Sequence, residues 1–321
     1  MKSLEQYSDQ LKGILAEFNL PQHPENLYAS IDYILSLGGK RLRPLMVLMS
    51  ADAFGASNTD AEKMALVVEL FHNFSLMHDD IMDNADLRRG KPSVHVKWDI
   101  PTAILGGDAL LVKTYQVLMK LKGAYRDELI DLYNTTAIEV CEGQQMDMNF
   151  ENREAVSIKE YTEMIRLKTA VLMGAAFKMG AVCSEADSKQ QNLMYDFGQY
   201  LGIAFQIKDD FLDCFGSDAF GKKVGGDIIE NKKTYLQLKA LELGSTAQNE
   251  QLKSLWAESD ETKKIEAVKQ LFEDTGAKGA AEEAMNEYYQ KGLQSLSAAE
   301  LNPENETYLA KFAEYVWLRD K

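Results

Sequence analysis

Two groups of aspartates with the same spacing, DDxxD, are the residues that most directly predict chemistry. The groups are Asp79, Asp80 and Asp83, and Asp209, Asp210 and Asp213. Residues four apart share one face of a helix, where like charges repel by roughly 0.2–0.5 kcal/mol. Both groups also close an apolar run, so they would lie at the negative end of a helix dipole. A cation between the outer aspartates would remove both penalties, and carboxylates without His or Cys suit Mg²⁺.

Four basic segments supply the cations that a phosphate site also needs. They are GGKRLRP (38–44), LRRGKP (87–92), RLKTA (166–170) and GKKVGGDIIENKKT (221–234). Glycine permits close backbone approach, and arginine makes bidentate phosphate contacts. One basic turn or one acidic helix end would be ordinary solvated surface, and the GxxxxGK[ST] spacing of a nucleotide-binding loop is absent. Two acidic motifs with four basic segments predict a polyphosphate held through several Mg²⁺ ions.

The overall charge narrows the range of partners. The 321 residues include 35 Lys and Arg against 50 Asp and Glu, a net charge of −15. This excess argues against nucleic acid as a partner and weakens attraction to anionic lipid. The first residues are polar and no apolar stretch is long enough to cross a bilayer, so we expect no membrane span and a cytoplasmic location. The three cysteines are isolated and indicate neither a zinc site nor a redox pair.

The residues around the motifs predict an all-α chain. Only 6 prolines occur, good helix formers dominate, and apolar residues recur at three- and four-residue spacing almost throughout. The stretches 61–83 and 195–215 are apolar nearly all round, which predicts helices buried within a bundle. The charged segment 246–300 predicts more peripheral helices. No break is long enough to be a domain linker, so we expect one domain over residues 1–321.

Taken in order, the motifs GGKRLRP, HDDIMD with LRRGKP, KT, FQIKDDFLD and GKKVGGD resemble the trans-isoprenyl (polyprenyl) diphosphate synthases. The resemblance implies an isoprenoid-synthase-type helical bundle around a central active-site cavity, assembled as a homodimer. It implies a prenyltransferase, with three Mg²⁺ ions, that condenses isopentenyl diphosphate with an allylic diphosphate (dimethylallyl, geranyl or farnesyl). The allylic diphosphate would ionise, the isopentenyl double bond would attack the carbocation, and a proton would then pass to the departing pyrophosphate.

The resemblance also implies a role for each motif position. Direct Mg²⁺ ligands are Asp79, Asp83 and Asp209, whereas Asp80, Asp210 and Asp213 act indirectly or through water. The allylic-substrate residues are Arg88, Lys168, Thr169, Gln206, Lys222 and Lys232, and of these Arg88 and Lys168 belong with the six aspartates to the catalytic group. The isopentenyl diphosphate residues are Lys40, Arg43, His72 and Arg89; by itself, His72 would be read as a core histidine. Gln144 and Asp147 are expected to line the cavity, and His95 to be structural.

Residues upstream of the first motif bear on product length. In the family that the chain resembles, the growing tail runs along the helix before this motif, and bulky residues one or two turns upstream form the floor. Phe74 stands five residues before Asp79, Ser75 four residues before it, and Phe71 one turn further upstream. This pattern resembles short-chain enzymes that make C20 geranylgeranyl diphosphate, with C15 farnesyl diphosphate close behind.

Two other functions stay open from the sequence. A class I terpene cyclase shares the first DDxxD, but its second metal motif normally has an Asn/Ser/Glu pattern, and GGKRLRP would have no purpose there. A non-catalytic helical partner subunit would be expected to lose motif residues, and both clusters are intact here.

Overall fold

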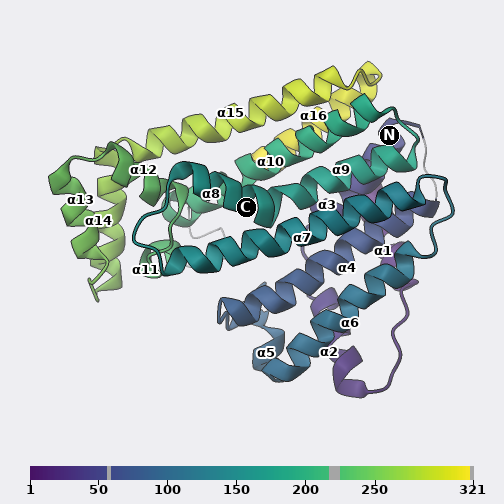
Figure 1. Ribbon diagram of the computed structural model, residues 1–321, viewed down its shortest axis with the longest axis horizontal. Coiled ribbons are helices and arrows are strands. Elements are labelled where there is room, and N and C mark those ends of the chain that lie inside the picture. Colours follow the sequence, from purple (N-terminus) through teal and green to yellow (C-terminus); the bar gives the residue numbers. More distant parts are fainter. Residues whose placement is uncertain (56–58, 217–224, 319–321) are drawn as a thin grey trace. The chain divides into compact units, whose positions relative to one another are not determined.

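The computed structural model describes residues 1–55, 59–216 and 225–318, and these are almost entirely helical (Figure 1). The α-helices are α1 (Leu4–Ala16), α2 (Glu25–Ser36), α3 (Leu42–Ala53), α4 (Thr59–Met82), α5 (Val94–Lys97), α6 (Ile100–Leu118), α7 (Arg126–Glu151), α8 (Ile158–Ile165), α9 (Val171–Cys183), α10 (Ser188–Phe215), α11 (Gly226–Ile229), α12 (Tyr235–Leu243), α13 (Thr246–Leu255), α14 (Glu261–Asp274), α15 (Ala277–Ala298) and α16 (Pro303–Trp317). A π-helix, η1 (Arg166–Ala170), joins α8 to α9, and strands β1 (Leu87–Arg88) and β2 (Lys91–Pro92) form an antiparallel hairpin. The predicted all-α class is confirmed.

Helix starts follow local sequence signals. Ser3, Ser157 and Ser245 each accept a hydrogen bond from the backbone three residues on, and the side chain at that position bonds back to the cap. Such capping boxes satisfy amide groups that the first helical turn leaves without partners. Asp99 caps α6 in a related way, through the backbone nitrogen of Thr102. No helix in the described part of the chain is long and apolar enough to cross a membrane.

The chain forms two compact units. The first contains Met1–Thr135, Ala175–Tyr195 and Ala299–Glu306, and the second contains Thr136–Gly174, Asp196–Ala298 and Thr307–Lys321. The first motif therefore belongs to one unit and the second motif to the other. One domain over residues 1–321 stays a prediction.

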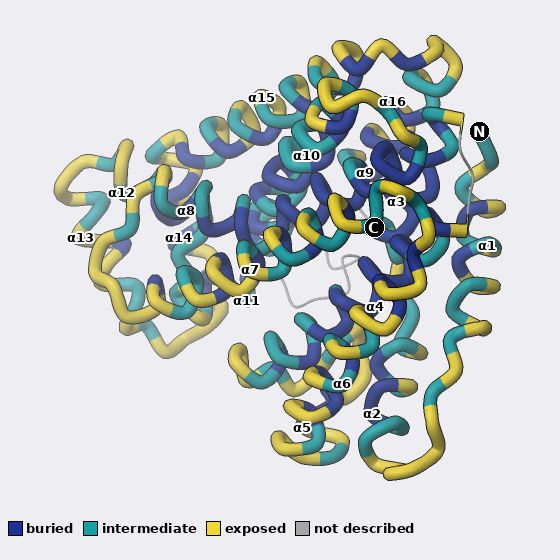
Figure 2. Tube along the Cα trace, turned by 45° about the vertical axis from the view of Figure 1, so that its right-hand side comes forward, coloured by how far each residue is buried: buried dark blue, intermediate teal, exposed yellow. Residues whose placement is uncertain are grey.

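In the first unit, α4 packs against α3 and α6. Both α3 and α4 are buried along most of their length (Figure 2), which agrees with the apolar stretch predicted at 61–83. Glycines bring α6 close to α4, because a Cβ added at Gly107 would lie 2.3 Å from Nε2 of His78. The C-terminal turn of α4, which carries the first aspartates, therefore packs closely against α6.

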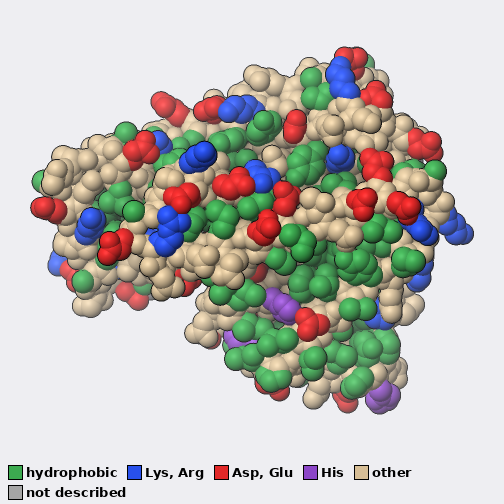
Figure 3. All heavy atoms as spheres, in the orientation of Figure 1, with side chains coloured by type: hydrophobic (Ala, Val, Ile, Leu, Met, Phe, Trp, Pro, Cys, Tyr) green, Lys and Arg blue, Asp and Glu red, His purple; other side chains and the backbone are tan. Residues whose placement is uncertain are grey.

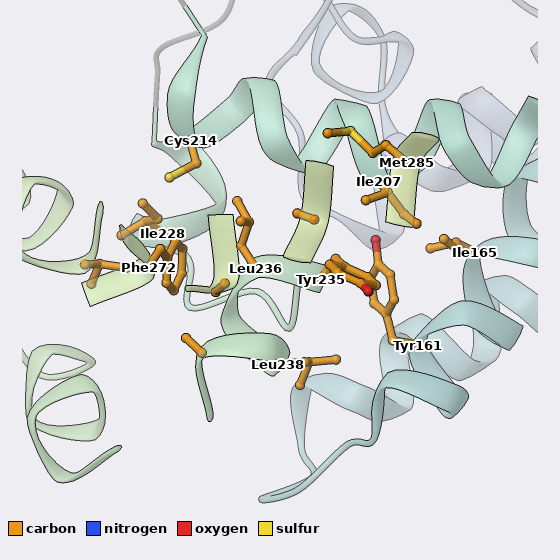
Figure 4. Close-up of a cluster of buried hydrophobic side chains, with 14 of the residues drawn as sticks. Tyr161, Ile165, Ile207, Cys214, Ile228, Tyr235, Leu236, Leu238, Phe272 and Met285 are labelled. Atoms are coloured by element: carbon orange, nitrogen blue, oxygen red, sulfur yellow. The ribbon is translucent and has the colours of Figure 1, made fainter. Parts of the chain in front are cut away.

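In the second unit, a core of apolar side chains surrounds the inner face of α10. It includes Tyr161, Ile207, Leu236, Phe272 and Met285 (Figure 4). Phe272 on α14 and Met285 on α15 belong to the charged segment 246–300. These helices bury one apolar face, and their charged residues occupy the other positions. The core supports the end of α10 that carries the second aspartate motif.

Candidate active site

The first aspartate motif occupies the last turn of α4 and the residue beyond it. Asp79 is partly exposed and Asp83 is exposed, whereas Asp80 is buried. The backbone nitrogen of Asp83 donates to the carbonyl of Asp79 at 2.8 Å, so the helical path continues through the motif. The outer two carboxylates thus remain accessible to a ligand while the middle one turns inward.

Asp80 is held by an arginine from the β-hairpin. Arg88 donates from Nε to Oδ1 of Asp80 at 2.9 Å, and its Nη2 contacts the same oxygen. The other carboxylate oxygen of Asp80 is buried and has no hydrogen-bond partner. Burial raises the pKa of Asp80, and the bonds from Arg88 oppose that rise. Arg88 therefore lies against the first motif, and its catalytic role stays a prediction.

A basic cluster forms at the N-terminal side of α3 in the same unit. Nη1 of Arg43 donates to Nε2 of His72 at 3.3 Å, and Nη1 of Arg89 contacts the carbonyl oxygen of Gly38. Lys40 is exposed in the same loop. Burial, together with the positive charge of Arg43 and other arginines, holds the pKa of His72 well below its usual range. A neutral His72 that accepts from Arg43 is thus favoured here. The four predicted residues of the isopentenyl diphosphate group lie in the loop before α3, on α3, on α4 and in the hairpin turn.

Glycine and positive backbone angles make this cluster possible. Arg89 has φ 54° and Gly90 has φ 74°, as the tight hairpin turn requires. A Cβ added at Gly39 would lie 2.6 Å from Cζ of Arg89, so only glycine leaves room for the guanidinium there. The GGK sequence thus provides space for a cation as well as a turn.

Lys168 and Thr169 lie in the π-helix η1 and contact two different helices. Nζ of Lys168 pairs with Oδ2 of Asp147 on α7 at 2.6 Å. The hydroxyl of Thr169 donates to Oε1 of Gln206 on α10 at 3.1 Å. A π-helix adds one residue to a turn, and such bulges are frequent at functional sites. Three predicted site residues and Asp147 therefore meet within the second unit.

In the second aspartate motif, as in the first, the middle carboxylate is buried and the first one is partly exposed. Asp210 is buried and accepts from the hydroxyl of Tyr161 at 2.5 Å, from the backbone nitrogen of Tyr235 at 3.1 Å and from Nε2 of Gln206 at 3.3 Å. Figure 4 shows Tyr161 and Tyr235 side by side in the apolar core of the second unit. Burial and the nearby charge of Asp227 raise the pKa of Asp210 to about 7, against these hydrogen bonds. Asp209, in contrast, is partly exposed.

Asp213 accepts hydrogen bonds from the start of α11. Its Oδ1 accepts from the backbone nitrogen of Asp227 at 2.9 Å, and its carbonyl accepts from Gly225 at 2.7 Å. Lys232 lies further along the chain and pairs with Glu230 at 3.1 Å. Lys222, the remaining allylic-substrate candidate, lies outside the described residues.

The other candidates fall into two kinds. Gln144 is buried on α7, and neither its amide oxygen nor its amide nitrogen has a hydrogen-bond partner. Such a buried amide is costly unless something satisfies it. His95 makes a local contact, with Nδ1 lying 3.2 Å from Oγ of Ser93. Gln144 is therefore suited to meet a ligand, whereas the surroundings of His95 agree with its expected structural role.

The residues predicted to set product length lie on α4 above the first motif. Phe71 and Phe74 are buried, with ring centroids 5.5 Å apart. Phe71 also packs edge-on against Tyr133 at 5.6 Å, and Phe74 against His78 at 4.9 Å. Ser75 is a small residue, and its hydroxyl donates to the carbonyl of His72 at 2.9 Å. The aromatic cluster thus lies on α4 about one to two turns before the aspartates.

Sequence reasoning missed the partners that hold these groups. Tyr161 carried no local signal, because a tyrosine on an amphipathic helix is ordinary core. Gly143 did carry one, since glycine is unfavourable in the middle of a helix and commonly marks close packing there. A Cβ at Gly143 would lie 2.2 Å from the backbone nitrogen of Lys168. Among the described residues, no group of three or more His, Cys, Asp or Glu side chains forms a ready metal site.

The chain is similar to known proteins over most of its length. A family model described as polyprenyl synthetase matches residues 24–275. A geranylgeranyl pyrophosphate synthase from Geoglobus acetivorans is 39% identical over 303 residues, 93% of this chain and 92% of the relative. A short chain isoprenyl diphosphate synthase from Methanothermobacter thermautotrophicus is 37% identical over 322 residues, 100% of this chain and 98% of the relative.

Solved structures agree with this match. A crystal structure described as geranylgeranyl pyrophosphate synthase has a TM-score of 0.93 with 44% identity, and the match covers 100% of both chains. The resemblance inferred from the motifs is thus confirmed in sequence and in fold. The chain belongs to the polyprenyl synthetase family, among its short-chain trans-prenyl diphosphate synthases.

Proposed function

We propose that this prenyltransferase condenses isopentenyl diphosphate with allylic diphosphates in a Mg²⁺-dependent reaction and stops mainly at C20 geranylgeranyl diphosphate. One observation carries the proposal. In each DDxxD motif the middle aspartate is buried and held by donors of its own unit, while Asp79, Asp83 and Asp209 stay accessible. A motif that served only as a solvated helix end would have no reason to fix its middle carboxylate in this way.

The residues fit Mg²⁺ by their chemistry. The accessible donors Asp79, Asp83 and Asp209 are carboxylates, and Oδ2 of Asp80 is a buried acceptor without a partner. Mg²⁺ is usually held by one or two carboxylates together with water and substrate phosphates. The proposed direct ligands are Asp79, Asp83 and Asp209, for three ions in all. When bound, Mg²⁺ would neutralise the charge that develops on the leaving pyrophosphate.

The side chains of the protein would divide the substrates between them. Arg88, Lys168 and Thr169 would bind the allylic diphosphate, with Gln206, Lys222 and Lys232 in support. Arg43, His72, Arg89 and Lys40 would bind isopentenyl diphosphate. Fixed cations of this kind stabilise the charge that appears as the allylic C–O bond breaks. They also hold the second substrate so that its double bond meets the allylic C1.

The bond changes then balance without a protein base. The C–O electron pair leaves with pyrophosphate, and the isopentenyl double bond forms the new C–C bond to the carbocation. Loss of a proton to a pyrophosphate oxygen restores a double bond in the longer product. The aromatic and apolar side chains beside the cation would keep water out, because water would quench it.

The aromatic cluster on α4 supports a C20 product. Phe71 and Phe74 are both buried above the first motif, and Phe74 lies against His78, the residue before Asp79. Two of the relatives reported above are named as geranylgeranyl pyrophosphate synthases. Farnesyl diphosphate, C15, is the next product by the same reasoning.

A homodimer is proposed from the outer face of α6. Leu105, Val112 and Met119 recur every seven residues and are 60%, 57% and 63% exposed. Hydrophobic side chains gather over this region in Figure 3. A second copy of the chain, which presents the same stripe, would bury it in a two-fold interface. Leu105→Glu should shift the protein from dimer to monomer in sedimentation velocity, and an unchanged profile would contradict this interface.

The function is tested by incubating the purified protein with Mg²⁺, isopentenyl diphosphate and C5, C10 or C15 allylic diphosphates, then sizing the products. Linear C20 diphosphate is the expected main product from each starter. Family membership already favours prenyl transfer over cyclisation. A cyclic hydrocarbon without elongation would indicate a terpene cyclase, and no pyrophosphate release would indicate a non-catalytic subunit.

A further inference from the structure

Glu69 is a buried carboxylate that the proposed reaction does not use. It lies on α4, one turn before His72, and its side chain is only 2% exposed. Its Oε1 is 3.3 Å from Nε of Arg41, and its Oε2 is buried without a hydrogen-bond partner. Burial raises the pKa of Glu69, and the charge of Arg41 is the main opposing influence. A buried carboxylate is unfavourable unless it is paired with a positive charge.

Arg41 is the positively charged partner of Glu69. It immediately precedes α3 with φ 46°, a left-handed conformation that is costly for a residue with a side chain. Its Nη2 donates to the carbonyl of Leu35 at 2.7 Å, so the guanidinium bridges the end of α2 and the middle of α4. Arg41 therefore turns back into its own unit, although its neighbours suggest a phosphate ligand.

The loop that Arg41 fixes carries the basic cluster. Gly38 and Gly39 have φ 78° and 108°, so the loop takes a path that needs support from side chains. Arg89 contacts the carbonyl of Gly38, and Arg43, two residues after Arg41, meets His72. Two polar positions one turn apart on α4 thus each meet an arginine: Glu69 meets Arg41 at the end of this loop, and His72 meets Arg43 in the first turn of α3.

We infer that Glu69, acting through Arg41, is a positioning residue for isopentenyl diphosphate. The ion pair fixes loop 38–41, and the loop leads into the first turn of α3, which places Arg43 beside His72, and provides the carbonyl that receives Arg89. The inference rests on the proposed function, because it takes these residues as the isopentenyl diphosphate group. Glu69 itself touches no substrate, and the allylic group around Arg88 and Lys168 does not depend on it.

Glu69→Gln tests this inference, because glutamine keeps the shape and removes the charge. The KM for isopentenyl diphosphate should rise about tenfold or more, as expected when a buried ion pair is lost. The KM for farnesyl diphosphate should stay within about twofold, a split that general loosening of the fold would not produce. Glu62→Gln is the matched control: it removes the same charge from α4 at a partly buried contact with Gln10, away from loop 38–41, and should change neither KM.

Two further variants separate positioning from simple charge balance. The double variant Arg41→Gln with Glu69→Gln leaves no unpaired charge. Its KM for isopentenyl diphosphate should still remain high, because the loop has lost the ion pair that fixes it. Arg41→Lys keeps the charge but not the fork of donors, and should raise the same KM. If Glu69→Gln does not fold, Arg41→Lys decides the question.

An unchanged KM for isopentenyl diphosphate in both single variants, equal rises for both substrates, or recovery in the double variant would overturn the inference. These outcomes differ from a failure of the proposed function. If the proposed function is wrong, the wild-type protein itself transfers no prenyl group.

Discussion

Gly143 on α7 lies directly against the backbone of Lys168 in the π-helix. A Cβ at position 143 would stand 2.2 Å from the nitrogen and 2.7 Å from the Cα of Lys168, and both atoms are backbone that cannot turn aside. One helical turn further along α7, Asp147 pairs with the ammonium group of the same lysine at 2.6 Å. Two residues on one face of α7 thus set both the backbone and the side chain of Lys168.

This contact predicts the effect of one methyl group. Gly143→Ala should displace η1, lower kcat and reduce the free energy of unfolding by about 1–3 kcal/mol, as overpacking does. Gly279→Ala on α15 is the matched control, because a Cβ there meets nothing within 4 Å. The control should be neutral or stabilising by about 0.5–1 kcal/mol. Urea unfolding and steady-state kinetics measure both effects; equal behaviour of the two variants would refute the close contact.

The accessible aspartates predict loss of turnover without loss of the fold. Asp79→Asn and Asp209→Asn keep the side-chain shape and remove the charge of one proposed metal ligand each. Turnover should fall about 10²–10³-fold or more in each variant, while circular dichroism stays that of the wild type. Near-normal turnover in either variant would remove that residue from the set of metal ligands.

The aromatic cluster predicts a change in product length. Phe74→Ala should open space beside α4 and shift the products beyond C20. Phe177→Ala serves as the control, since Phe177 is also buried in the same unit but lies on α9. Both changes will cost stability, about 3–5 kcal/mol for a buried phenylalanine, so the assay is run below the unfolding temperature of each variant. If Phe74→Ala and the wild type give the same products, Phe74 does not set the length.

The low pKa of His72 predicts a dependence of stability on pH. In the folded chain the burial of the ring and its arginine neighbours keep it neutral, whereas in the unfolded chain it takes up a proton near pH 6.5. The unfolded state therefore binds more protons below that pH, and the stability linked to His72 is present above pH 6.5 and lost as pH falls. Relative to His72→Gln, the wild type should lose up to about 1.4 kcal/mol per pH unit below pH 6. Urea unfolding at pH 7.5 and pH 5 measures this, and parallel curves would contradict it.

The sequence predicted the helices and the chemistry well. The apolar stretch 61–83 coincides with α4, Thr59–Met82, and 195–215 lies within α10, because continuous apolar periodicity is a strong signal. The aspartates and basic segments were found because their types and spacing recur. Their roles as ligands of metal and substrate remain a proposal.

The supporting contacts were beyond reach from the sequence. Tyr161 meets Asp210, 49 residues away, and neither local composition nor spacing indicates that pairing. The π-helix at 166–170 lies against Gly143 on the neighbouring helix, and Arg41 pairs with Glu69, 28 residues away in the sequence. Such contacts depend on the register between helices, which periodicity alone does not determine.

The most direct test of the account counts pyrophosphate against new C–C bonds. Purified protein with Mg²⁺, isopentenyl diphosphate and farnesyl diphosphate should release one pyrophosphate for each C20 diphosphate formed. Chelation of Mg²⁺, and separately Asp79→Asn and Asp209→Asn, should suppress both signals together. Pyrophosphate release without elongation, or C20 formation that persists when Mg²⁺ is removed, would contradict the central claim that both aspartate motifs hold the metal ions for prenyl transfer.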